Sequence, residues 1–329
     1  MNQIPYGCVS FSTPQDISGS LIAAGASSKV YKGFFKRGRK AKKEVVAIKM
    51  LFCVELSASV IDRFGDEIRL LNRLSHPNIL RCCGVCIMPP ALCLVTEFCG
   101  HGSLYHFLQK EISISLRWNK KLSMILDCIN GVSYLHSKGI VHGDIKSLNF
   151  FVTDNCVVKL GDLGEHRVVG EEVDVNRPMP KLRNWSAPEI LAGTYGPLYD
   201  CSSDVYSLAM VISEIVSGEV PFDDAETKNL ELDEFIHFVS DERNRPSLGG
   251  RCETPTAFKE VLRHCFFTDP KKRCSSTDLL NGVIECFETS EKVVSFVDDE
   301  LDRGVILGSE EEIGDLLEET QEETGEEAV

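Results

Sequence analysis

The hydrophobic pattern of the chain changes near residue 100, and this change limits the folds open to it. Strands are predicted by short runs of apolar and β-branched residues, at 17–53, 80–87 and 92–98. One amphipathic helix is predicted between them, over 57–75. After Gly100 and Gly102 the apolar spacing becomes mainly helical. Strands followed by helices predict an α+β chain of two lobes with a cleft between them.

Two helices stand out in the second half. Apolar residues from Leu122 to Leu135 share one face, and Gly139 is expected to end that helix. A second helix is expected from Asp204 to Val216, with Ser203 as its N-cap and Gly218 as its end.

Charge is distributed unevenly. The 329 residues carry a net charge of -15, but residues 298–329 alone hold fourteen Asp and Glu against one Arg. The remainder is close to neutral, so no basic face is predicted for nucleic acid. No apolar run approaches the ~20 residues that span a bilayer. The first residues lack a signal-peptide pattern, so we expect an intracellular, cytoplasmic protein that does not bind membranes.

Fourteen cysteines are scattered along the chain, without paired Cys-x-x-Cys knuckles. A structural zinc site would need two such clusters. We interpret the cysteines as small buried side chains in a reducing compartment.

Two charged residues lie where apolar ones are expected. Lys49 is inside the predicted strand Val45–Leu51, and Glu67 shares the apolar helical face of Phe64 and Leu71. Buried Lys and Glu usually have partners, so an ion pair is predicted. The alternative is that each side chain reaches solvent separately.

Two loops between apolar segments carry further candidates. His142–Asn149 precedes the predicted strand Phe150–Val152, and Gly161–Gly164 follows another at Val157–Leu160. Asp144, Asn149 and Asp162 in these loops are residue types that hold a divalent cation and orient a hydroxyl. An Asp in a Gly-containing turn also has an ordinary structural explanation.

Taken in order, these motifs resemble the eukaryotic protein kinase family from about Ile17 to Phe287. The resemblance rests on Val46-Ala47-Ile48-Lys49, His142-Gly143-Asp144, Asp162-Leu163-Gly164 and Ala187-Pro188-Glu189. Segments around His76-Pro77-Asn78 and Trp185 are similar to the tyrosine-kinase-like group, which includes the Raf, mixed-lineage and receptor-interacting kinases. The fold implied is a small β-rich lobe with one main helix and a larger helical lobe.

The resemblance implies roles for individual residues. Asp144 would accept the substrate hydroxyl proton, and Lys146 would stabilise the transferring phosphate. Lys49, held by Glu67, would bind the α and β phosphates of ATP, and Asn149 and Asp162 would bind Mg²⁺. The remaining nucleotide contacts implied are Ile22, Ala23, Gly25, Val30, Ala47, Thr96 as gatekeeper, Glu97 and Cys99 of the hinge, and Phe151. Arg273 would pair with Glu189, and Asp204 would support the catalytic loop.

The implied domains are a lead at 1–16, a kinase domain at 17–290 and an acidic, disordered tail at 291–329. Within the kinase domain, the first lobe is 17–98 and the hinge and second lobe are 99–290.

The sequence departs from the family pattern in two places. Of the three glycines of the phosphate loop only Gly25 remains, which predicts weaker ATP affinity. Gly143 stands where an Arg usually precedes the catalytic Asp, and residues 163–185 contain no Ser, Thr or Tyr. Together these absences predict a kinase without a phosphorylation switch in its activation segment.

We therefore expect an ATP- and Mg²⁺-dependent kinase that phosphorylates Ser or Thr of protein substrates. Lys146, two residues after Asp144, favours Ser/Thr over Tyr. The alternative is an ATP-binding pseudokinase that acts as a scaffold. The basic stretch 36–43 suggests a solvated hairpin tip, or alternatively a nuclear-import or docking signal. The tail offers a partner-binding segment or a self-inhibitory one.

Overall fold

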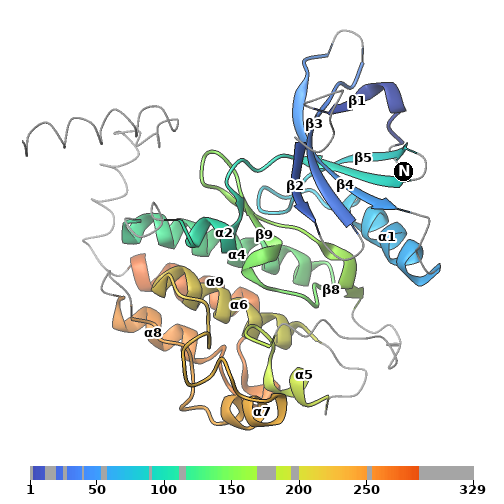
Figure 1. Cartoon of the computed structure of the whole chain (residues 1–329). Helices are drawn as coiled ribbons and strands as arrows, with labels where there is room; N and C mark the ends of the chain where they lie inside the picture. The colour runs from blue at the N-terminus through green and yellow to red at the C-terminus, as the bar shows by residue number, and fades with distance from the viewer. Residues whose placement is uncertain are drawn as a thin grey trace, which may run out of the picture. The chain divides into compact units, whose positions relative to one another are not determined.

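The computed structural model describes residues 3–11, 20–24, 28–38, 41–52, 58–88, 91–110, 116–168, 183–193, 200–249 and 254–288. Gly25, the centre of the basic stretch and the tail 291–329 lie outside the described residues, as do the expectations placed on them. The described chain forms a β-rich lobe followed by a mainly helical lobe, as Figure 1 shows. The predicted α+β class and order of the lobes are confirmed.

The first lobe is built on an antiparallel sheet with the strand order β1-β3-β4-β6-β5, and β2 pairs with β3. Its strands are β1 (Val9–Phe11), β2 (Leu21–Ala24), β3 (Ser28–Phe35), β4 (Glu44–Phe52), β5 (Cys82–Met88) and β6 (Ala91–Glu97). The basic stretch connects β3 to β4, where a hairpin was predicted.

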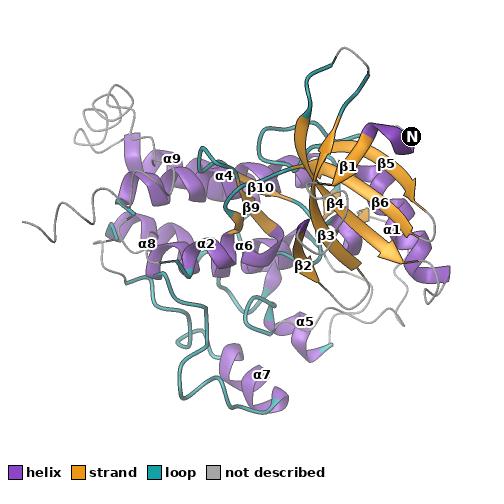
Figure 2. Cartoon of the chain, turned by 45° about the horizontal axis from the view of Figure 1, so that its top comes forward, coloured by secondary structure: helices purple, strands orange, loops and turns teal. Residues whose placement is uncertain are grey.

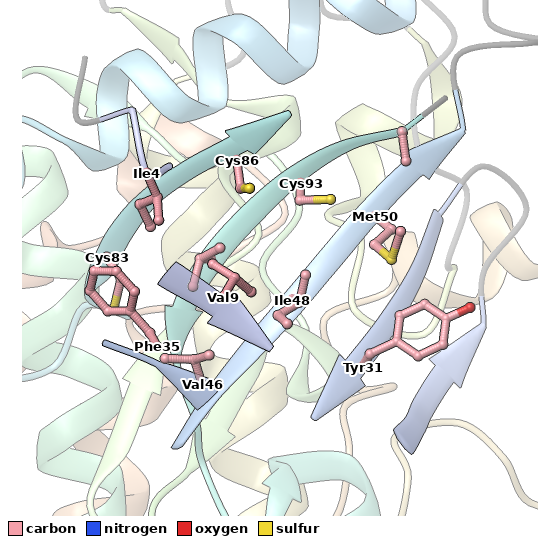
Figure 3. Close-up of a cluster of buried hydrophobic side chains, with 12 residues drawn as sticks. Ile4, Val9, Tyr31, Phe35, Val46, Ile48, Met50, Cys83, Cys86 and Cys93 are labelled. Carbon is pink, nitrogen blue, oxygen red and sulfur yellow. The ribbon is translucent and has the colours of Figure 1, made fainter. Parts of the chain in front are cut away.

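Alternation along β4 assigns its side chains to two faces of the sheet. Val46, Ile48 and Met50 are buried in the core of the lobe, together with cysteines from β5 and β6. Figure 3 shows this cluster, with Cys83, Cys86 and Cys93 packed as small apolar side chains, as the sequence predicted. The intervening residues Ala47 and Lys49 therefore point to the opposite face.

The N-terminal segment differs from the irregular lead that was expected. A 3₁₀ helix, η1 (Tyr6–Cys8), leads into β1, which pairs with β3 from Val9 opposite Phe35. Ile4 donates its amide to the Val85 carbonyl (2.7 Å) and is buried in the same core cluster. The segment has too few alternating apolar residues to predict a strand. Its buried residues Ile4 and Val9 nevertheless pack against the core of the lobe.

Helix α1 (Ala58–Leu71) lies beside the sheet. Phe64, Ile68 and Leu71 are buried, and Glu67 shares their face at 3% exposure. The helix ends four residues earlier than predicted, and a turn follows in which Arg73 donates its amide to the Leu70 carbonyl (2.8 Å).

The second lobe contains the remaining helices, shown in purple in Figure 2. They are α2 (Leu104–Leu108), α4 (Trp118–Ser137), α5 (Pro188–Ala192), α6 (Cys201–Ser217), α7 (Leu232–Ser240), α8 (Thr256–Arg263) and α9 (Ser276–Glu288). Two small sheets join β10 (Val158–Leu160), β9 (Phe150–Val152) and β7 (Gly102–Ser103), and β11 (Arg167–Val168) with β8 (Ile140–Val141).

The ends of α4 and α6 test the capping predictions. Gly139 follows α4 with a left-handed φ of 69° and ends it as expected. Gly218 likewise caps α6, at φ 78°. The N-cap of α6 is Asp200 and not Ser203, because the Asp200 carboxylate accepts the Ser202 amide (2.8 Å) and the helix begins at Cys201. Ser203 lies inside the first turn, and its hydroxyl donates to Glu189 (3.2 Å).

Candidate active site

The catalytic-loop candidate, residues 142–149, follows β8 directly and is anchored by Asp204 of α6. One Asp204 oxygen accepts the amide of His142 (2.7 Å), and the other accepts the amide of Gly143 (3.0 Å). Asp204 is 1% exposed, so these bonds are shielded from water. The predicted support of this loop by Asp204 is confirmed in its geometry.

His136 of α4 completes this anchor. Its Nε2 lies 3.0 Å from Asp204 Oδ2, and its Nδ1 lies 2.9 Å from the Ser276 hydroxyl. Burial opposes protonation of His136, but the hydrogen bonds to Asp204 and Cys201 outweigh it and raise the pKa of His136 to about 9. The anchor is therefore a buried ion pair at neutral pH.

Asp144 is the carboxylate at the centre of the loop. Its Oδ2 lies 2.6 Å from Lys146 Nζ and accepts a hydrogen bond from Asn149 Nδ2 (2.9 Å). The Asp144 side chain is 15% exposed, so solvent or a substrate can still reach it. Two neighbours thus orient one carboxylate oxygen, as a positioned proton acceptor requires.

Lys49 bridges the two acidic groups that face it. Its Nζ lies 3.3 Å from each carboxylate oxygen of Glu67 and 2.7 Å from Asp162 Oδ1. Burial opposes its charge, but Asp162 and Glu67 outweigh burial and raise the pKa of Lys49. Lys49 in turn lowers the pKa of Asp162 against burial. The predicted ion pair between Lys49 and Glu67 is confirmed, and Asp162 joins it.

Asp162 has a left-handed backbone, with φ 57° and ψ 65°, which is uncommon for a residue other than glycine. The preceding residue holds it there, because the Gly161 amide donates to the Asn149 carbonyl (2.9 Å) and the Gly161 carbonyl lies 3.0 Å from His142 Nε2. Such a conformation costs on the order of 1–3 kcal/mol and is concentrated at functional sites.

The donor set around these residues fits a magnesium ion. Asp162 supplies a carboxylate, and the backbone bond between Gly161 and Asn149 brings the two candidate ligands to neighbouring positions. Asn149 uses its amide nitrogen on Asp144, so its amide oxygen is the atom that can face a cation. Oxygen ligands of this kind are those that Mg²⁺ prefers.

The residues expected around the nucleotide lie on facing strands. Ala23 pairs with Val30, Val30 with Lys49, and Ala47 with Thr96. Thr96, the expected gatekeeper, is 6% exposed. Ile22 is 47% exposed on β2, and Gly25 lies outside the described residues.

The hinge candidates are Glu97, the last residue of β6, and Cys99, two residues further on. The Glu97 carbonyl accepts from the Thr96 hydroxyl (3.2 Å), and the Glu97 side chain contacts Lys159 Nζ (3.2 Å). In the described part of the chain the Cys99 amide donates no hydrogen bond, whereas its carbonyl accepts from Gly102 (3.1 Å). Phe151 lies on β9 opposite Lys159, half-buried.

Beyond the loop, a further ion pair anchors α5. Arg273 places two nitrogens on the two Glu189 oxygens, at 2.6 and 2.7 Å, and both residues are buried. This bidentate geometry confirms the predicted pair. Residues 169–182, which make up the whole segment between Val168 and Arg183, lie outside the described residues.

Sequence analysis missed a buried carboxylate behind the catalytic loop. Glu214 of α6 is fully buried and accepts hydrogen bonds from the Ser147 hydroxyl (2.8 Å) and from Trp185 Nε1 (3.0 Å). Burial raises the pKa of Glu214 to about 7. Glu214 thus joins the loop to the residues before α5. The available signal was a single Glu within the apolar run Ala209–Val216.

Comparisons with known proteins identify the family of the chain. The family described as protein tyrosine and serine/threonine kinase matches residues 18–283. The serine/threonine/tyrosine-protein kinase HT1 of Arabidopsis thaliana is 30% identical over 278 residues, which are 83% of this chain and 67% of that protein. The probable serine/threonine-protein kinase drkD of Dictyostelium discoideum is 32% identical over 279 residues, 83% of this chain and 20% of its own length. The serine/threonine-protein kinase STY17 of Arabidopsis thaliana is 30% identical over 259 residues, 79% of this chain and 42% of its own.

The chain therefore belongs to the protein kinase family. It spans two thirds of one of these relatives and less than half of the other two. Among the described helices, none combines the length and apolar character needed to cross a membrane.

Proposed function

We propose that the chain is an ATP- and Mg²⁺-dependent protein kinase that phosphorylates serine and threonine hydroxyls of protein substrates. The observation that carries this proposal is the pairing of Asp144 with Lys146 at 2.6 Å, beside a Lys49 bound by both Glu67 and Asp162. Phosphoryl transfer depends mainly on position and electrostatics, and this arrangement supplies both.

Asp144 accepts the proton of the substrate hydroxyl as that oxygen attacks. Asn149 and Lys146 hold its Oδ2, which leaves the other carboxylate oxygen to face the substrate. Lys146 also brings a positive charge to the place where a negatively charged phosphoryl group arrives. Lys49 offers a second cation on the nucleotide side, and Glu67 keeps it in position.

Asn149 and Asp162 would hold Mg²⁺, which neutralises charge on the phosphates of ATP when it is bound. Thr96, Glu97 and Cys99 would face the adenine, and Ile22, Ala23, Val30, Ala47 and Phe151 would enclose it.

Two observations support serine and threonine as acceptors. Lys146 stands two residues after Asp144, as in serine/threonine kinases, and the names of all three relatives include serine/threonine kinase. The name of the HT1 relative also includes tyrosine, so analysis of the phosphorylated residue is part of the test.

The test is transfer of radiolabelled phosphate from ATP to a generic protein substrate. Asp144→Asn removes the proton acceptor and is expected to lower kcat by about 10²–10⁴-fold, with ATP affinity unchanged within about threefold. Lys49→Met is expected to lower both transfer and ATP affinity. Asp233→Asn, an exposed change on α7, is the matched control and should behave as wild type.

Wild-type protein that binds ATP but transfers no phosphate would overturn the proposal in favour of a scaffold. Label on tyrosine alone would overturn only the acceptor specificity.

We also propose that activity needs no phosphate on the activation segment. Residues 163–185 contain no acceptor hydroxyl, and Gly143 replaces the Arg that would read one. Gly143 has a φ of 80°, a conformation that glycine adopts without strain.

Treatment with a broad-specificity phosphatase, followed by repurification, should therefore leave kcat within about twofold of the untreated value. Mass spectrometry before and after treatment checks that phosphate was removed. A loss of activity of about tenfold after phosphatase treatment, as expected for a phosphorylation switch, would contradict this part of the proposal.

A further inference from the structure

Two cysteines of the second lobe lie with their sulfurs in contact. Cys265 Sγ and Cys274 Sγ are 3.4 Å apart. Cys265 comes just after α8, and Cys274 comes just after the 3₁₀ helix η6 (Pro270–Lys272). The Cys274 amide donates to the His264 carbonyl (3.3 Å), so the backbones of the two segments are already joined beside the sulfurs.

The two thiols differ in exposure and acidity. Cys265 is fully buried, whereas Cys274 is partly exposed. A hydrogen bond from the Cys265 thiol lowers the pKa of Cys274, and the same bond together with burial raises the pKa of Cys265. The more accessible sulfur is thus the one that becomes a thiolate, which is the form that reacts with oxidants.

We propose that Cys265 and Cys274 are a peroxide-sensitive modification site that closes to a disulfide. The Cys274 thiolate attacks hydrogen peroxide, which breaks the O–O bond and gives a Cys274 sulfenic acid and hydroxide. The Cys265 thiol then attacks that sulfur, and water leaves as the S–S bond forms. Two thiols are oxidised, and one peroxide is reduced to two molecules of water.

The surrounding contacts suit this reaction. A disulfide requires the sulfurs to approach from 3.4 Å to about 2.05 Å. The intervening loop is already held by Arg245, which donates to the Phe266 carbonyl at 3.0 and 2.8 Å, and by Arg273, which donates to the Phe267 carbonyl at 2.7 Å. The pair therefore closes by side-chain movement, without refolding of the loop.

The site adjoins the anchor of α5. Cys274 directly follows Arg273, whose guanidinium forms the buried pair with Glu189. The cross-link would join the two ends of the loop between Cys265 and Cys274. Carbonyls of this loop accept hydrogen bonds from Arg273. It thereby stabilises the lobe around that anchor.

Peptide mapping of the full chain tests the proposal. The purified protein is treated with hydrogen peroxide, remaining thiols are alkylated, and the chain is digested with trypsin and an acidic-residue protease. Trypsin cuts after Lys271, Lys272 and Arg273 and so separates the two cysteines. The acidic-residue protease separates Cys274 from Cys286. The expected product is a Cys265–Cys274 linked peptide that a reductant splits.

Cys286→Ser is the matched control, because Cys286 is a partly exposed thiol on the neighbouring α9. This variant should form the same linked peptide, and Cys274→Ser should not. The oxidised wild type should also unfold at a higher temperature than its reduced form, a difference that Cys274→Ser abolishes.

The proposal is overturned if peroxide leaves both thiols available for alkylation, or if Cys274 is converted to a sulfinic acid without cross-linking. A linked form that unfolds at a lower temperature than the reduced form would also contradict it, because a pre-aligned pair should not distort the lobe. Since mapping needs no phosphoryl transfer, failure here is distinct from failure of the proposed kinase activity.

Discussion

The catalytic loop and strand β2 belong to the same candidate active site but are held in opposite ways. Residues 142–149 are mostly buried and are tied by Asp204 and Glu214 to α6 behind them. His136 of α4 bonds in turn to Asp204. All four residues of β2 are exposed, and this strand pairs only with β3 in the described sheet. The larger lobe thus fixes the residues proposed for chemistry, whereas β2 depends on one neighbouring strand.

This difference predicts where mutations will matter. A change behind the catalytic loop removes buried bonds that nothing replaces, so it should affect stability and rate together. A change on β2 alters an exposed backbone, so it should affect nucleotide affinity and little else.

The largest effect is expected for Asp204→Asn. The substitution removes the charge opposite His136 and one acceptor for the two loop amides. Breaking a buried pair of this kind costs about 3–5 kcal/mol. Urea unfolding should show that loss, and kcat should fall with it. Asp200→Ala, at the exposed N-cap of the same helix, should cost only about 1 kcal/mol. Equal losses of unfolding free energy in the two variants would show that the buried bonds of Asp204 contribute no more to stability than an exposed N-cap.

A smaller effect is expected from pH, through His136. Its pKa is raised from 6.5 to about 9 in the folded protein, so the folded state binds the proton more tightly than the unfolded state. This stabilisation is complete below pH 6.5 and is lost as pH rises through about 9, with a total of about 3 kcal/mol.

Unfolding free energies measured from pH 6.5 to 9 should therefore decline in wild type more steeply than in His136→Asn, which can still donate to Asp204 but does not titrate. Parallel curves for the two proteins would show that His136 is not protonated in the folded state.

The smallest effect is expected on β2. Ala23→Gly restores a glycine where the phosphate loop of kinases usually has one, and gives the backbone access to positive φ. The KM for ATP should fall by about two- to fivefold, with kcat and stability nearly unchanged. Ala24→Gly, next to it but outside the glycine positions of the motif, is the control. An equal change in both variants would indicate general loosening of the strand.

The same contrast explains what could be predicted from sequence. Lys49 and Glu67 were identifiable because each places a charge in an apolar pattern, and an ion pair is the least costly way to bury both. The pair between Glu189 and Arg273 and the support from Asp204 followed from family resemblance. In each case one chemical requirement determines one partner.

The rest could not be read in this way. The third contact of Lys49, to Asp162, depends on the left-handed backbone of Asp162. Sequence does not predict that conformation for a residue other than glycine. Glu214 is identifiable as a charged residue in an apolar run. Its hydrogen-bond donors Ser147 and Trp185 are 67 and 29 residues away, and no sequence pattern links them to it. The strand β1 was missed because three residues contain too little alternation to predict a strand.

The strand β1 and the residues before it extend the folded lobe beyond the region that matches the kinase family. The recognisable family sequence starts at residue 18, but Ile4 and Val9 lie over the sheet and pack with Val46, Ile48 and Cys83. A chain that began at residue 18 would expose this apolar surface to water and to other copies of the chain. For this kinase, the portion that similarity detects is therefore smaller than the portion that packs into the first lobe.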